Sequence, residues 1–309
     1  MKRHTALSRI TWAATAVTCA GALLLSGCAG TDSTPSETTT AATTSTTTQA
    51  TEARTNADII EAQEPGTTFA VHSPETVDFV ATALQEAGVP EDAIAGFRSW
   101  AESYAEAIPY DAIDDPQNYQ TGVAVEALQQ ENPRLVNCRM LTYLLAGHTI
   151  DVAQPEGADT SGLFMDHEQM DREPALFTGA DRDRYNAIYG RIAASHEPNE
   201  AELASTITEY QAEHGITFAE DKILPIDVYL HDTLDLEAFL FIGHTGLAIP
   251  YQGKYLFLEK LSFEEPFQAT WYDLPQDIVT VVRDRYDDSE ATKGAAPIVT
   301  VSGTYFPGN

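Results

Sequence analysis

Apolar residues in the first part of the chain recur at the spacing of an amphipathic helix. Val77, Val80 and Leu84 lie three to four residues apart behind the capping residue Ser73, and Gly88 ends the run. This spacing gives one apolar face and a defined start and end. The same criteria predict helices over residues 90–109, 122–130, 181–194, 199–214 and 274–286, and a buried helix that starts at residue 138.

The period of the pattern changes after residue 224. Apolar runs predict strands over residues 226–230, 236–250, 254–263 and 297–301. Tyr251-Gln252-Gly253 separates the second and third runs and predicts a hairpin turn. Residues 151–181 are rich in Gly, Asp and Glu and predict a long loop. Helices followed by an antiparallel sheet indicate an α+β fold, and residues 67–309 suffice for a single domain of this kind.

The first 27 residues have the pattern of a secretion signal. A basic start is followed by an apolar stretch from about Trp12 to Leu25, which is short for a membrane span. Leu25-Ser26-Gly27-Cys28 then resembles the lipobox of bacterial lipoproteins. That resemblance implies cleavage before Cys28, attachment of lipid to its sulfur, and a protein anchored on the outer face of the cell membrane. The alternative is an uncleaved anchor helix.

Residues 28–66 are rich in Thr, Ser and Ala and poor in large apolar residues. Such a segment cannot bury enough surface to offset the entropy of ordering, so we expect a disordered tether. The chain has 17 Lys and Arg against 47 Asp and Glu, and its formal charge of −30 becomes −33 once the three cations of the signal are removed. This negative charge argues against nucleic acid as a binding partner and against electrostatic docking on anionic lipid. The expected partners are the bilayer, through Cys28, and a peptide or cell-wall substrate.

Signal processing accounts for two of the three cysteines and leaves Cys138 as the one thiol of the folded part. Its place at the first turn of a helix lowers the pKa of a thiol, because unpaired N–H groups and the helix dipole stabilise the thiolate. The backbone N–H groups of Cys138 and Arg139 could also bind an oxyanion. His244 lies about a hundred residues later in a predicted strand, so the pair has the outline of a cysteine hydrolase.

The hairpin supplies a third residue. If Pro250 lies opposite Tyr255, Gly246 faces Glu259, and His244 becomes a diagonal neighbour of Glu259 on the same face. Glu259 is then the natural orienter of the imidazole. A register slip of one residue would place the two on opposite faces. The fallback acids are Glu264, Glu265 and Asp227.

Other interpretations remain open for the same residues. Cys138 and His244 could be packed core residues, and Glu259 could belong to the solvent face of an edge strand. A metal site could form from Asp166, His167 and Glu168 with Asp171 and Glu173, or from Asp227 with His231. The first cluster is more typical of a solvated surface loop, and no zinc-type spacing is present. A non-catalytic surface lipoprotein that binds a ligand or partner is the remaining class.

Several motifs resemble a known family. They are Asn137-Cys138-Arg139, Gly243-His244-Thr245-Gly246, and Leu258 to Phe263 followed by Glu265-Pro266. Together they resemble a bacterial lipoprotein family catalogued as a domain of unknown function (DUF4300), over about residues 70–305. More distantly, the order of the elements resembles papain-like hydrolases, including NlpC-type cell-wall peptidases. That resemblance implies a peptidase or amidase that needs no cofactor, with Gln129 or Gln130 as a possible oxyanion donor.

Overall fold

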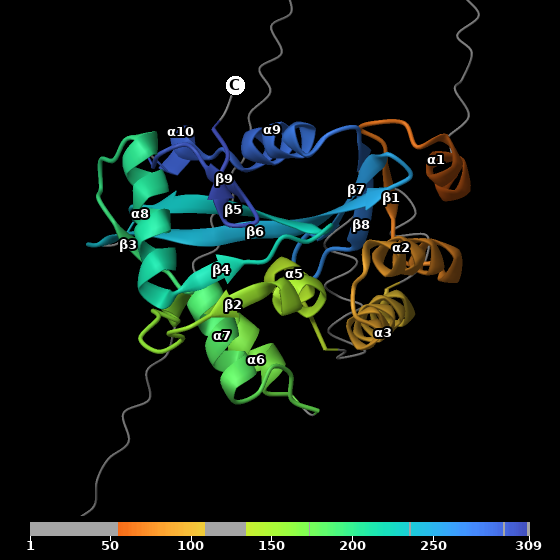
Figure 1. The fold of residues 1–309 in the computed structure, drawn as a ribbon, viewed down its shortest axis with the longest axis horizontal. Coiled ribbons are helices and arrows are strands. Elements are labelled where there is room, and N and C mark those ends of the chain that lie inside the picture. Colours follow the sequence, from red (N-terminus) through yellow and green to blue (C-terminus); the bar gives the residue numbers. More distant parts are fainter. Residues whose placement is uncertain (1–54, 109–133, 173, 235, 293, 308–309) are drawn as a thin grey trace, which may run out of the picture. The chain divides into compact units, whose positions relative to one another are not determined.

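The computed structural model describes residues 55–108, 134–172, 174–234, 236–292 and 294–307 (Figure 1). The predicted signal, the tether up to residue 54 and the helix predicted over 122–130 lie outside these ranges. Cys28, Gln129 and Gln130 therefore lie outside the described residues as well.

The first half of the described chain is mostly helical, and most of the strands follow residue 216. The helices are α1 (Asn56–Ala62), α2 (Pro74–Ala87), α3 (Glu91–Ala107), α5 (Cys138–Ala146), α6 (Phe164–Met170), α7 (Ala180–Tyr189), α8 (Glu200–His214), α9 (Pro275–Tyr286) and α10 (Ser289–Thr292). The strands are β1 (Thr68–Ala70), β2 (Ile150–Val152), β3 (Ile192–Ala194), β4 (Ile216–Phe218), β5 (Leu224–Asp232), β6 (Ala238–Tyr251), β7 (Lys254–Lys260), β8 (Phe267–Tyr272), β9 (Ile298–Val301) and β10 (Thr304–Tyr305).

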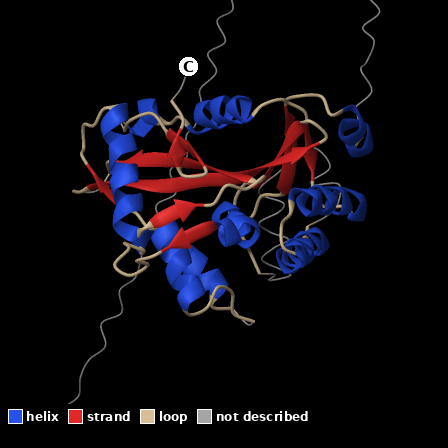
Figure 2. Cartoon of the chain, in the orientation of Figure 1, coloured by secondary structure: helices blue, strands red, loops and turns tan. Residues whose placement is uncertain are grey.

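Most of the strands form one antiparallel sheet, so the fold is α+β as predicted. Its strands run in the order β1-β8-β7-β6-β5-β9-β10, with β3 paired to one end of β6, while β2 and β4 form a separate pair. Figure 2 shows the strands as a layer between helices. In Figure 1, α9 lies on one side of this layer and α2, α3 and α5 lie on the other.

Each face of the sheet has its own apolar core. The larger core includes Leu84 of α2, Phe97 of α3 and Leu141 of α5, packed on Leu247 and Leu258 of the sheet. The smaller core joins α9 to the opposite face of β5, β7 and β9. A helix on each face leaves the central strands buried on both sides, which is why they read as nearly continuous apolar runs in the sequence.

The predicted hairpin has the predicted register. Pro250 pairs with Tyr255 between β6 and β7, and the turn residues Gln252 and Gly253 have φ of 49° and 83°. Two central residues with positive φ are typical of the tight turns whose twist matches that of the strands. However, β7 ends at Lys260, three residues before the predicted end. The ladder between β6 and β7 stops at Leu247 and Leu258, so the pairing of Gly246 with Glu259 is not formed.

Two predictions for the middle of the chain are wrong in part. The helix predicted over residues 181–194 ends at Tyr189, because Gly190 takes an extended conformation with ψ of 156°. The residues that follow form β3 and pair with β6. The segment 151–181, which was predicted to be a loop, contains the helix α6. The side chain of Asp166 in this helix is fully buried.

The end of the predicted tether also differs from the prediction. Residues 56–62 form α1, which begins with Thr55 and Asp58 in a reciprocal cap. The carbonyl of Gln63 accepts a hydrogen bond from Lys254 Nζ at 2.8 Å, and the N–H of Gly66 donates to the carbonyl of Trp271 at 2.7 Å. These contacts attach residues 55–66 to the sheet, so they belong to the folded part.

Candidate active site

Cys138 is the first residue of α5, as the sequence predicted. The Asn137 side chain caps the helix by accepting a hydrogen bond from the N–H of Met140 at 3.0 Å. The cap uses one N–H of the first turn and leaves those of Cys138 and Arg139 without an acceptor inside the helix. Seven of the nine residues of α5 are buried, and Cys138 itself is 5% exposed.

His244 follows a bulge in β6. Val228 pairs with His244 while the next residue of β5, Tyr229, pairs with Ile242, so Gly243 is the extra residue. A Cβ on Gly243 would lie 2.3 Å from a methyl carbon of Leu230, so a larger residue would displace its neighbour. The bulge shifts the alternation of β6 by one residue at the point where His244 begins.

Glu259 accepts the hydrogen bond that the sequence assigned to it. Its Oε2 lies 2.7 Å from Nε2 of His244, and both residues are fully buried just beyond the end of the β6–β7 ladder. The edge-strand interpretation of Glu259 is wrong, because β7 lies between β6 and β8. Gly246, which was expected to face Glu259, lies against another side chain. A Cβ there would lie 2.6 Å from the ring of Phe257, so Gly246 makes room for Phe257.

The carboxylate of Glu259 has two further partners that the sequence did not identify. Gln268 of β8 donates its Nε2 to Oε1 at 2.7 Å, and one guanidinium nitrogen of Arg285 lies 2.8 Å from Oε1 and 2.9 Å from Oε2. Burial raises the pKa of Glu259, but the contacts with His244 and Arg285 outweigh it and lower the pKa to about 2. Glu259 is therefore a carboxylate at neutral pH.

The imidazole of His244 favours the thiolate of Cys138, and Cys138 in turn favours the imidazolium of His244. Because Nε2 of His244 is bound to Glu259, the nitrogen that remains for the thiol is Nδ1. Burial raises the pKa of Cys138, but His244, Arg139 and the backbone of Thr245 outweigh it, so the thiol pKa lies below its ordinary value. Burial lowers the pKa of His244, but Cys138 and Glu259 raise it to about 9. His244 is therefore an imidazolium at neutral pH, and its charge favours the thiolate of Cys138.

The last turn of α9 covers this pair from the other side of the sheet. Tyr286 stacks on the imidazole of His244, with ring centroids 4.6 Å apart and an interplanar angle of 18°. Arg285 precedes it and binds Glu259. A sequence signal existed, since both residues end the helix predicted over 274–286. Only the tertiary fold brings that helix end next to β6 and β7.

The fallback acids take other partners. Asp227 accepts a hydrogen bond from the hydroxyl of Thr245 at 2.6 Å, and burial raises its pKa to about 6. The charges of Glu264 and Glu265 act to raise the pKa of Lys260. The ammonium of Lys260 donates hydrogen bonds to the backbone carbonyls of residues 262, 263 and 265. Burial lowers the pKa of Lys260 to about 7. Lys260 belongs to the opposite face of β7 from Glu259.

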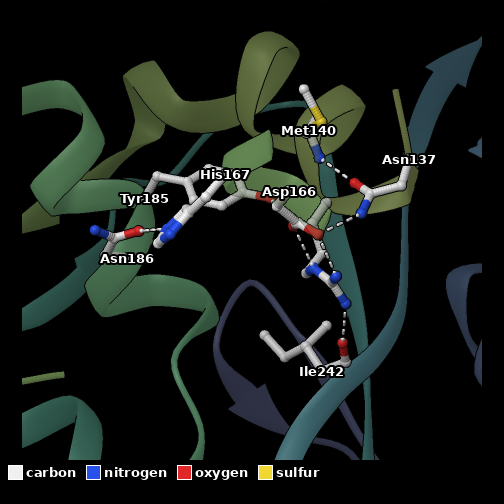
Figure 3. Close-up of polar contacts among 8 residues, drawn as sticks. Asn137, Met140, Asp166, His167, Tyr185, Asn186 and Ile242 are labelled. Atoms are coloured by element: carbon white, nitrogen blue, oxygen red, sulfur yellow. Dashed lines mark hydrogen bonds and ion pairs between the residues drawn. The ribbon is translucent and has the colours of Figure 1, made fainter. Parts of the chain in front are cut away.

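The two metal hypotheses find no assembled ligand set in the described part of the chain, where no group of three or more His, Cys, Asp or Glu side chains could hold an ion. Asp166 is fully buried in α6 and binds Asn137 and Arg139, so the expected solvated loop is wrong (Figure 3). His167 pairs through Nε2 with Asn186 at 2.8 Å. Glu173 lies outside the described residues. His231 Nε2 contacts the carbonyl of Ser195 at 2.8 Å.

Comparison with known proteins identifies one family. The sequence profile of a domain of unknown function (DUF4300) matches residues 69–305. No curated protein and no solved structure matches the chain significantly.

Among the helices of the described residues, none is both long and apolar enough to cross a membrane.

Proposed function

The chain belongs to the DUF4300 family, and from that premise we propose that it is a cysteine hydrolase that cleaves an amide bond. Cys138 is the nucleophile, His244 transfers protons, and Glu259 orients and charges the imidazole. The observation that carries this proposal is the hydrogen bond of His244 to a fully buried carboxylate, together with the influence of the same imidazole on Cys138, which lowers the thiol pKa. The helix α5 and the β6–β7 hairpin, which are far apart in the sequence, contribute to it in the arrangement expected of an activated nucleophile.

In the first half of the reaction, the thiolate sulfur of Cys138 attacks the carbonyl carbon and forms a C–S bond. The π electrons of the carbonyl move to its oxygen. The free N–H groups at the start of α5, those of Cys138 and Arg139, are suited to stabilise this oxyanion. When the oxyanion collapses, the C–N bond breaks, and the leaving nitrogen takes the proton from Nδ1 of His244. A thioester and a free amine result.

In the second half, Nδ1 of the now neutral His244 removes a proton from water, and the hydroxide oxygen attacks the thioester. The C–S bond then breaks, and its electron pair returns to the sulfur of Cys138. The product is a carboxylic acid, and the imidazolium and thiolate are restored. Throughout, Glu259 stays ionised, because its pKa of about 2 lies far below neutral pH. A fixed negative charge beside Nε2 favours the imidazolium in both halves.

The substrate class follows from the expected location. Cleavage before Cys28 and lipid attachment would place the domain outside the cell on a tether, within reach of amide bonds of the envelope such as those of wall peptides. The order of the site, with a cysteine at a helix start and a histidine and an acid on neighbouring strands, supports a papain-like arrangement. The protein would lie on the outer face of the membrane, where Cys28 would anchor the chain.

The experiment compares two reactions of the same thiol. Alkylation by iodoacetamide, followed at the Cys138 peptide by mass spectrometry, reports the thiolate. Hydrolysis of purified wall peptides reports turnover. We expect Cys138→Ala to abolish hydrolysis. We expect His244→Ala to lower alkylation at pH 6 by about a hundredfold, because the thiol pKa returns toward its ordinary value.

The pH dependence of the two reactions differs on the alkaline side. Both rates should rise with pH through the lowered pKa of Cys138 and reach a plateau. Above about pH 9 His244 loses its proton, so hydrolysis should fall for lack of a proton donor to the leaving group. Alkylation should continue, because it needs only the thiolate. Parallel pH profiles of the two rates would contradict the assigned role of His244.

The burial of the site favours a second function, a surface lipoprotein that binds a ligand or partner without turnover. Cys138 is 5% exposed and His244 1% exposed. The same experiment separates the two functions. An inert protein would alkylate slowly at pH 6, and His244→Ala would leave that rate unchanged.

A further inference from the structure

Asp166 binds both residues that flank Cys138. Its Oδ1 accepts a hydrogen bond from Nδ2 of Asn137 at 3.0 Å and one from Arg139 at 2.7 Å, and its Oδ2 accepts another from Nε of Arg139 at 2.9 Å. Figure 3 shows this carboxylate between the start of α5 and the end of Tyr185, which donates its hydroxyl to Oδ2. Asp166 is fully buried, Asn137 and Tyr185 are buried as well, and the side chain of Arg139 is 15% exposed.

Arg139 carries the connection on to the histidine strand. Its third nitrogen donates to the carbonyl of Ile242 at 3.1 Å, and Ile242 is the last residue before the bulge at Gly243 that places His244. One guanidinium thus joins α6, α5 and β6. A planar fork with several donors fixes direction as well as distance, which a single hydrogen bond does not.

We propose that Asp166 is a positioning residue for the nucleophile, and that it acts through Arg139 and Asn137 to hold Cys138 beside the imidazole of His244. This inference rests on the proposed function, because the thiol that Asp166 positions is the proposed nucleophile. Asp166 touches neither the sulfur nor the imidazole. Its role is to keep the start of α5 and the bulge of β6 in one arrangement, because small displacements of reacting groups cost large factors in rate.

A purely electrostatic role of Asp166 predicts the opposite change in the alkylation rate of Cys138. The cation of Arg139 lowers the pKa of Cys138, and the carboxylate of Asp166 offsets part of that cation. If charge were all that mattered, removing the carboxylate would strengthen the field of Arg139, lower the thiol pKa further and speed alkylation at pH 6. If Asp166 positions the thiol, its removal weakens the contact with His244, raises the thiol pKa and slows alkylation.

The decisive variant is Asp166→Asn in the full-length protein. It keeps the shape of the side chain and one oxygen acceptor but loses the charge and one fork contact with Arg139. We expect alkylation of Cys138 at pH 6 to fall about tenfold, and the midpoint of its pH profile to rise by about one pH unit. Arg139→Lys keeps the cation, loses the fork and should show a fall of similar size. If Asp166→Asn does not fold, as judged by circular dichroism, Arg139→Lys decides in the same way.

A matched control is available in the same chain. Asp159 binds Arg191 through Nε and another guanidinium nitrogen at 3.2 and 3.0 Å, but this pair is partly exposed and makes no described contact with the α5 segment. Asp159→Asn should leave the alkylation rate of Cys138 unchanged. Alkylation in Asp166→Asn that equals or exceeds that of the unchanged protein overturns the proposal.

The alkylation measurement keeps this inference separate from the proposed function. It needs no substrate, so it tests positioning even if no wall peptide is hydrolysed. Conversely, hydrolysis that is lost in Cys138→Ala and unaffected in Asp166→Asn would uphold the hydrolase and reject the positioning role. Where hydrolysis occurs, we expect Asp166→Asn to lower kcat with little change in KM, because Asp166 is placed to align the nucleophile and not to bind substrate.

Discussion

Two fully buried carboxylates frame the candidate site, and they are bound in similar ways. Glu259 accepts hydrogen bonds from His244, Gln268 and Arg285. Asp166 accepts them from Asn137, Arg139 and Tyr185. Each has one arginine, one amide and one aromatic partner, and neither is exposed to solvent.

The difference lies in the third partner. Glu259 contacts an imidazole with a pKa of about 9, a group that gains and loses a proton during the proposed reaction. Tyr185 has a pKa well above its ordinary value, because burial and the charge of Asp166 disfavour its anion, so it keeps its proton. The charge of Glu259 can therefore act on chemistry directly. Asp166 has no such partner, and in our proposal it acts through geometry.

The largest expected effect comes from removing the charge of Glu259. Glu259→Gln leaves Arg285 beside His244 without its counter-ion, so the imidazolium loses its stabilisation. We expect the free energy of unfolding to fall by about 3 kcal/mol, since one partner of a buried ion pair is lost. We also expect alkylation of Cys138 at pH 6 to fall about a hundredfold, more than for Asp166→Asn.

The pKa of His244 distinguishes the two carboxylates most clearly. It can be followed by NMR titration in a Cys138→Ala background, which removes the influence of the thiol. There Glu259→Gln should lower the pKa of His244, while Asp166→Asn should leave it unchanged. A similar fall in both variants would show that Asp166 affects the imidazole electrostatically, and the contrast between the two would fail.

A third buried carboxylate provides the next test. Asp227 lacks a cationic partner of the kind that Glu259 and Asp166 have, and burial raises its pKa to about 6 while the hydroxyl of Thr245 partly offsets this. Its ionised form is thus a cost that is fully present above pH 6 and absent below pH 3.8. Asp227→Asn should raise the free energy of unfolding by about 2 kcal/mol at pH 8 and leave it unchanged near pH 3.5.

Urea unfolding at the two pH values measures this difference. The sign for Glu259 is opposite, because its pKa is lowered to about 2. Its stabilisation is present above pH 4.5 and disappears as the pH falls toward 2. An equal gain for Asp227→Asn at both pH values would mean that packing, and not ionisation, sets the cost of this residue.

The sequence was sufficient for Glu259 and insufficient for Asp166, and the reason is physical. A hairpin with a tight turn fixes its register locally, so counting back from Tyr251-Gln252-Gly253 was enough to bring Glu259 to His244. The ladder stops before Gly246, but the side chain of Glu259 bridges the remaining gap. Local geometry thus determined the hydrogen bond.

Asp166 lies in a stretch rich in Gly, Asp and Glu, and this composition was the reason for predicting a solvated loop there. Its burial depends on Arg139 and Tyr185, which come from α5 and α7. A cluster of charged residues predicts a solvent-exposed segment as long as the cation that pairs with it is unknown. The same holds for Gln268 and Arg285, whose contacts with Glu259 arise from the packing of β8 and α9 against β7. Only tertiary contacts distinguish these residues from surface side chains.

The smallest expected effect concerns the ring that covers the Glu259 side of the site. Tyr286 stacks on His244 at 4.6 Å between centroids, and a ring of this kind stabilises its partner by about 1 kcal/mol beyond the area it buries. Tyr286→Leu should therefore lower the free energy of unfolding by about 1 kcal/mol and slow alkylation of Cys138 a few-fold, since an imidazolium under an aromatic face is favoured. Tyr286→Phe keeps the ring and is the matched control. If Tyr286→Phe loses as much as Tyr286→Leu, the hydroxyl matters and the stack does not.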